Sequence, residues 1–290
     1  MQSITSFVLL VLALVAVGVL AHGDCHSSGK TEASVEAKEV VLRIRDAVDA
    51  SSLLHHDFLE CYAKGGFKDM AVATRLFAIN HYAYSRNFIQ YLTQVRDKLA
   101  AVSPDDVELI SENMDEENGN YAEEDYEILA QHDIKRELVE KVPHKVLIKH
   151  FLETVGVRQE DFDDQTTIGA IFTQDILKMY DEANACEALA IIGFSIEQTV
   201  STLYKFIWEG LKSHTDLNPD DYVFFPLHIL IDDGHAEHIQ DAFAALYTHD
   251  PEMCANAPSV VKNVLDRREQ MFTDLKAHVE EEVGGKICPE

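Results

Sequence analysis

The segment from Phe224 to His238 carries two imidazoles and one carboxylate in the spacing His228-x3-Asp232-x2-His235. At about 100° per residue in an α-helix, Asp232 lies about 40° to one side of His228, and His235 lies about 20° to the other. Burying three such groups without partners would be costly, and a divalent metal removes that cost. The spacing therefore predicts a metal site. The apolar residues on the same stripe are Phe224, Ile231, Ile239, Ala242 and Leu246.

The alternative for this stripe is a pair of core histidines satisfied by hydrogen bonds, with Asp232 as a capping residue. His238 is offset by about 60° from His235, so we expect it at the surface or behind the ligands. Asp233 is expected to point away from the stripe.

One helix cannot complete a metal site, and Glu197 is the first candidate from a second helix. Its apolar surroundings indicate either a metal ligand or a carboxyl group with a raised pKa. A hydrogen bond from a buried Tyr or Ser is the alternative. The residues that share its face are Cys186, Ala190, Gly193, Phe194, Val200, Ser201, Tyr204 and Trp208.

Two weaker candidates lie between these segments and the N-terminus. The acidic run from Glu112 to Gly119 ends an expected helix over 104–117, and the helical period favours Glu117 over Glu116 as the inward residue. His144 opens another helix, which continues through Phe151. Neither candidate is specific on its own.

The elements that must position these residues all have the helical period. The low content of 13 Gly and 7 Pro argues against a many-turned β fold. We expect an all-α bundle of about seven or eight helices in one domain over 35–283, followed by a tail at 284–290. One helical stretch should run over 168–212 with a break near Asn184.

The N-terminal residues 1–21 contain no charged side chain and read as a cleavable signal peptide, followed by a polar lead-in at 22–34. This predicts a secretory or extracellular protein without stable membrane insertion, in which some of the five cysteines could form disulfides. With 24 basic and 51 acidic residues, the formal net charge is −27, which excludes a nucleic-acid partner.

Taken together, these segments resemble the haem-oxygenase-like dimetal-carboxylate oxidases, which share their fold with the TenA and PqqC proteins. The resemblance covers roughly Leu54 to Tyr247. The matching segments are His56-Asp57-Phe58 with Lys64-Gly65, Phe77 to Tyr91, Asn113 to Glu116, His144 to Gly156, Glu197, Asn218 to Tyr222, and His228 to Ala236.

The resemblance implies a ligand set of Glu116, His144, Glu197, His228, Asp232 and His235, with Glu197 and Asp232 also serving catalysis. This set would hold two irons, or a manganese–iron pair, with O2 as co-substrate. It overrides the preference of the helical period for Glu117. The family usually has its His soon after the acidic motif, so 120–142 is expected to be an insertion, and His132 within it is the alternative to His144.

The function implied is an oxidase or oxygenase that acts on a small organic substrate, such as an amino-acid or fatty-acid derivative. One alternative is a haem-binding or haem-oxygenase-type protein that uses His55 or His56. Another is a secreted helical interaction protein without catalysis. A TenA-type hydrolase is disfavoured, because no cysteine has a partner that would activate it. Whether the chain forms a homodimer is left open.

Overall fold

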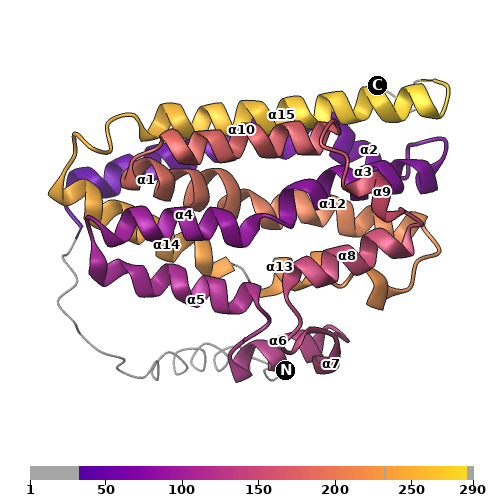
Figure 1. Ribbon diagram of the computed structural model, residues 1–290, viewed down its shortest axis with the longest axis horizontal. Helices are drawn as coiled ribbons and strands as arrows, with labels where there is room; N and C mark the ends of the chain where they lie inside the picture. The colour runs from indigo at the N-terminus through magenta and orange to yellow at the C-terminus, as the bar shows by residue number, and fades with distance from the viewer. Residues whose placement is uncertain (1–32, 232, 286–290) are drawn as a thin grey trace, which may run out of the picture. The chain divides into compact units, whose positions relative to one another are not determined.

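The computed structural model describes residues 33–231 and 233–285, and every regular element in these two ranges is helical (Figure 1). The predicted all-α class is confirmed. The expected signal peptide and Asp232 lie outside the described residues. The α-helices are α1 (Val35–Asp49), α2 (Asp57–Ala63), α3 (Met70–Ser85), α4 (Phe88–Ala100), α5 (Val107–Glu117), α6 (Glu123–Gln131), α7 (Arg136–Val139), α8 (His144–Thr154), α9 (Gln159–Phe162), α10 (Ile168–Glu182), α11 (Ala185–Ala190), α12 (Gln198–His214), α13 (Phe224–Ile231), α14 (Asp233–His249) and α15 (Ala257–Glu282).

The chain has more helices than the seven or eight expected, because side-chain caps divide the longer helical stretches. The Ser51 side chain accepts a hydrogen bond from the Leu53 amide. His56 Nδ1 accepts one from the Phe58 amide, so His56 is the N-cap of α2, which begins at Asp57. Such local bonds compete with helix continuation. The expected break near Asn184 is present between α10 and α11, where Asn184 caps α11.

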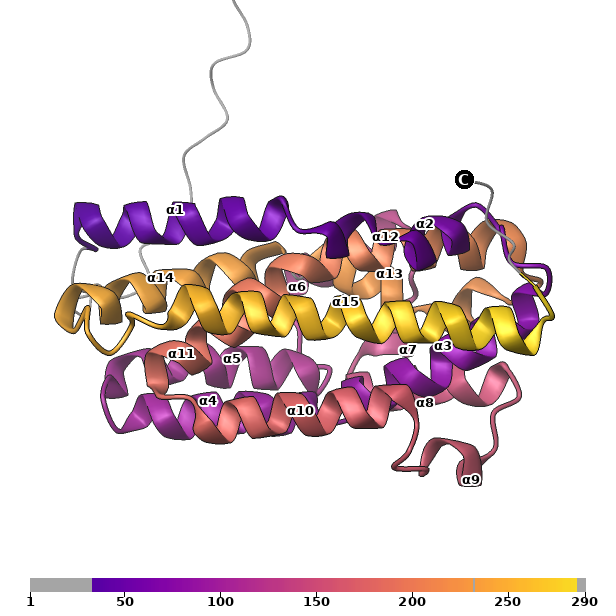
Figure 2. The ribbon, with the colours of Figure 1, turned by 90° about the horizontal axis from the view of Figure 1, so that it is seen from above.

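Helix α15 lies along α10 and also contacts α1 and α11 (Figures 1 and 2). Two glycines allow close helix contacts elsewhere. A Cβ on Gly169 of α10 would lie 2.0 Å from the backbone oxygen of Asn80 in α3, and one on Gly210 of α12 would lie 2.4 Å from Tyr62 Cδ1 in α2. These contacts hold α3 and α12 at fixed positions around the core.

A π-helix, η3 (Ile191–Glu197), connects α11 to α12, and all seven of its residues are buried. A π-helix changes the register of the backbone hydrogen bonds, so some carbonyls need other donors. Gln240 Nε2 donates to Gly193 O over 3.0 Å, and Thr199 Oγ1 donates to Ser195 O over 3.1 Å. The expected helical stretch is therefore present on both sides of Asn184, with Ile191–Glu197 in the π-helical form.

A disulfide and a backbone hydrogen bond each hold two segments together. A disulfide joins Cys186 in α11 to Cys254 before α15, with a Cα–Cα distance of 5.2 Å. Gly119 follows α5 with φ of +84°, and a Cβ there would lie 2.5 Å from the Val142 amide. The Lys141 amide donates to Gly119 O over 2.8 Å, so the two ends of the segment that carries α6 and α7 meet.

Among the described residues, no helix is both long and apolar enough to span a membrane.

Candidate metal centre

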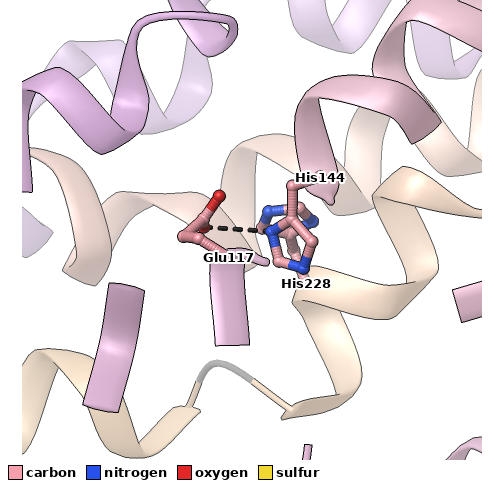
Figure 3. Close-up of side chains that lie close together, drawn as sticks. All are labelled: Glu117, His144 and His228. Atoms are coloured by element: carbon pink, nitrogen blue, oxygen red, sulfur yellow. Dashed lines mark ion pairs between the residues drawn. The ribbon is translucent and has the colours of Figure 1, made fainter. Parts of the chain in front are cut away.

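Three buried side chains from three helices meet in the interior: Glu117 at the end of α5, His144 at the start of α8, and His228 in α13 (Figure 3). One potential ligand atom from each residue lies within 4.8 Å of the others. The side chains converge because α13 packs against α12, and α8 packs against both α3 and α13. The cluster supplies two nitrogens and one carboxylate, a donor set that suits iron.

The geometry of His144 fits a metal ligand. His144 Nδ1 lies 3.0 Å from Glu117 Oε1, yet among the described residues this buried nitrogen has no hydrogen-bond partner. Its other ring nitrogen, Nε2, is hydrogen-bonded to the hydroxyl of Tyr121. With Nδ1 as a ligand, Nε2 carries the proton and donates to Tyr121 Oη, the kind of support that orients metal-bound histidines.

The second imidazole is oriented in the same way. His228 Nδ1 lies 2.6 Å from the carbonyl oxygen of Phe224, which can only accept a hydrogen bond. Nδ1 therefore carries the proton, and Nε2 carries the lone pair that a metal needs. The His144 and His228 rings lie side by side, with their centroids 4.4 Å apart.

Burial keeps these groups near neutrality in the metal-free protein. It lowers the pKa of His144 to about 3 and that of His228 to about 3. A nearby histidine also lowers each pKa, His235 for His144 and His144 for His228. Burial raises the pKa of Glu117 to about 7, although the nearby His228 and His235 act to lower it. Although Glu117 and His144 lie at ion-pair distance, burial disfavours the charged form of each. Neutral imidazoles are the form that binds metals.

A second group lies beside the cluster. His235 Nε2 of α14 lies 2.6 Å from Glu116 Oε2. Glu197 at the end of η3 is 7% exposed and accepts a hydrogen bond from Asn113 Nδ2 over 3.1 Å. Burial raises the pKa of Glu197, opposed by His235 and by the Asn113 bond. Two carboxylates and a histidine are thus gathered next to the first three ligand candidates.

The structure brings Glu117, rather than Glu116, together with His144 and His228. Glu116 instead contacts His235, so both adjacent carboxylates of α5 face imidazoles. The helical period favoured Glu117 as the inward residue, whereas the family resemblance implied Glu116 as the ligand. Asp232 lies outside the described residues.

The remaining histidines that the sequence singled out lie elsewhere. His132 and His238 are exposed, in keeping with a surface position for His238. His56 caps α2, and its Nε2 is hydrogen-bonded to Thr273 Oγ1 over 3.0 Å. His55 is exposed in the preceding turn. His132 therefore does not replace His144 in the cluster.

Sequence reasoning named Asn113 only as part of a matching segment, without a role, and did not single out Tyr121. Asn113 lies one turn before Glu117 on α5, and this i, i+4 spacing could have indicated a polar partner on the same face. Tyr121 lies in the irregular segment after α5, where no periodicity points to it. A small cavity of about 20 Å³ adjoins the cluster and is also lined by Ser85, Phe88, Ile196, Val200, Tyr204 and Phe224.

The helical architecture and the buried histidine–carboxylate cluster define a metal protein with a haem-oxygenase-like fold. Residues 75–268 match the model of a family described as iron-containing redox enzymes. The chain belongs to this family. No curated protein sequence matches the chain.

Solved structures share the fold at low sequence identity. A TenA homologue from Pseudomonas syringae is 12% identical with a TM-score of 0.62, over 85% of this chain and 98% of that one. A CADD-like protein of unknown function from Nostoc punctiforme is 13% identical with a TM-score of 0.63, over 89% and 100%. A domain of unknown function with a haem-oxygenase-like fold from Shewanella denitrificans is 16% identical with a TM-score of 0.55, over 87% and 97%.

Proposed function

We propose that this protein is an O2-activating di-iron oxidase or oxygenase that acts on a small organic substrate. The observation that carries the proposal is the buried Nδ1 of His144, which has no hydrogen-bond partner in the part of the chain that the structure describes and lies 3.0 Å from a carboxylate oxygen of Glu117. A bound cation would satisfy both atoms. The family of iron-containing redox enzymes supports iron as that cation.

Two ligand sets follow from the contacts. Glu117, His144 and His228 would hold one iron. Glu116 and His235 would hold the other. Asp232, which the sequence spacing puts on the same stripe as His228 and His235, would complete the ligands. Glu197 would be available to both sets, because it is buried and its pKa responds to His235, Glu116 and Glu117 alike. Ferrous iron held there supplies electrons for the reduction of dioxygen.

The protein's own residues orient and shield this centre. Phe224 O and Tyr121 Oη fix the ring orientations of His228 and His144. Asn113 Nδ2 donates a hydrogen bond to Glu197 Oε1, and within residues 33–231 and 233–285 no other hydrogen bond to this carboxylate is present, so its second oxygen would be available for a metal. Apolar side chains such as Ile196 and Phe224 line the adjoining cavity and limit the access of water.

Iron binding tests the two sets separately. Anaerobic protein should take up about two ferrous ions per chain and then consume O2. Glu117→Gln and Glu116→Gln should each retain about one iron, because each removes a carboxylate from a different set. His238→Gln is the matched control, since His238 is exposed on the same helix as His235 and should leave the iron content unchanged.

Three outcomes would contradict the proposal. Failure of the wild-type protein to bind non-haem iron would exclude a di-iron centre. Full iron content in Glu116→Gln would show that the second set is wrong. Stoichiometric haem binding with a Soret band, in place of non-haem iron, would favour the haem-binding alternative.

A further inference from the structure

Gln240 in α14 is 2% exposed, and its side-chain amide links α14 to three other elements. Its Nε2 donates to the carbonyl oxygen of Gly193 in η3 over 3.0 Å and to Gln198 Oε1 in α12 over 3.2 Å. Its Oε1 accepts a hydrogen bond from Arg45 Nε in α1. Both hydrogens and the oxygen of this buried amide therefore have partners.

A π-helix that continues as an α-helix leaves one carbonyl without a backbone donor of its own. In a π-helix each carbonyl bonds to the amide five residues ahead, whereas in an α-helix it bonds to the amide four residues ahead. Where η3 passes into α12, two consecutive carbonyls therefore point to the same amide, and one of them needs another donor. Gly193 O lies in this buried segment and receives an additional donor from Gln240.

The same contact brings together two segments that carry candidate ligands. A Cβ on Gly193 would lie 2.8 Å from Ile239 Cγ2, so η3 and α14 touch at this point. Glu197 lies four residues after Gly193, and His235 lies five residues before Gln240. Each candidate ligand is therefore about one helical turn from the contact. His235 acts to lower the pKa of Glu197, in agreement with this proximity.

We propose that Gln240 is a positioning residue, which holds η3 in the π-helical register against α14 so that Glu197 faces His235. An α-helical register over Ile191–Glu197 would turn Glu197 by about 100° relative to α11, the rotation of one residue. The disulfide at Cys186 fixes α11, so the carboxylate would move away from the ligand cluster. The importance of this position for metal binding rests on the proposed di-iron function, whereas the hold on η3 does not.

Hydrogen exchange in the metal-free protein tests the hold on η3 directly. Gln240→Met fills a similar volume without an amide, so the backbone amides of 191–197 should exchange about tenfold faster than in the wild type or more. Mass spectrometry of peptic peptides that cover this segment measures the exchange rate.

Gln240→Glu is the second variant, because it keeps an oxygen for Arg45 and removes the N–H donors to Gly193 O. It should also accelerate exchange over 191–197. An ion pair with Arg45 should keep its free energy of unfolding, measured in urea, close to that of the wild type. This variant therefore separates the loss of the Gly193 contact from a general loss of stability.

Both variants should bind at least one of the two ferrous ions about tenfold more weakly or worse, as expected when the support of a metal ligand is removed. The matched control is Gln198→Met. The Gln198 side chain bonds to Gln240 and, over 2.8 Å, to Asp49 Oδ1 rather than to η3. This control should leave both the iron affinity and the exchange over 191–197 unchanged.

Wild-type exchange over 191–197 in a folded Gln240→Met would overturn the proposal, and Gln240→Glu gives the same test if the Met variant does not fold. Faster exchange together with wild-type iron affinity would overturn the role for Glu197. An equal effect of Gln198→Met would overturn the assignment to Gln240. Faster exchange in Gln240→Met, in a protein whose wild type binds no iron, would support the hold on η3 and defeat the di-iron proposal alone.

Discussion

The disulfide between Cys186 and Cys254 allows a quantitative test of how the chain is held together. It closes a loop with a sequence separation of 68, which contains η3, α12, α13 and α14. Restricting the unfolded chain by a loop of this length is worth about 4 kcal/mol at 25 °C in the chain-entropy model. For a domain of this size, that loss corresponds to a decrease in Tm of about 8 °C.

The perturbation is Cys186→Ala combined with Cys254→Ala, because a reductant would also act on the other cysteines. Both side chains are buried, and Ala leaves no unpaired hydroxyl in the core. The free energy of unfolding is measured by urea denaturation with far-UV circular dichroism. Each single variant should lose about as much as the double variant, since either one breaks the same bond.

A loss below about 1 kcal/mol in the double variant would refute the loop-entropy reasoning, because entropic stabilisation by a loop of this length exceeds that value. Losses in the single variants that add up to the loss in the double variant would also refute it. Such additivity would mean that packing of the two side chains, rather than their bond, accounts for the effect.

Two further perturbations test the packing and capping described above. Gly169→Ala should lower the free energy of unfolding by about 1–3 kcal/mol in urea denaturation, because the added Cβ would meet Asn80 O at 2.0 Å; unchanged stability would contradict the close contact. Burial lowers the pKa of His56 in the folded protein, so its contribution to stability is present above about pH 6.5 and is lost as the pH falls through that value towards the lowered pKa. His56→Asn can still cap Phe58 but does not titrate, so urea denaturation should show a smaller loss than in the wild type between about pH 7 and 5; equal losses would contradict the assignment.

The helical period alone predicted much of the site, because burial on one side of a helix follows from spacing. His228 and Glu197 were placed inside on this basis, and both are buried. Glu117 was likewise favoured over Glu116 for the inward position. The family resemblance instead implied Glu116. In the structure the two residues face different histidines. The sequence alone does not show that both of these adjacent carboxylates have histidine partners.

Other features depend on contacts that no local pattern encodes. The π-helix at Ile191–Glu197 is accompanied by a donor from Gln240, which is distant in the sequence. Tyr121 reaches His144 from a segment without periodicity. The count of helices was too low because caps such as Ser51 and His56 interrupt stretches that remain periodic on either side.

The contact between Gly119 and Lys141 has a consequence for how this chain could change during evolution. Because the two ends of the intervening segment meet, its length does not set the distance between α5 and α8. Residues after Tyr121 can be gained or lost between these ends while Glu117 and His144 keep their positions and Tyr121 keeps its contact with His144. A long segment between Glu117 and His144 in the sequence is therefore compatible with an unaltered metal centre. Relatives can differ in the length of this segment and still keep the same ligands.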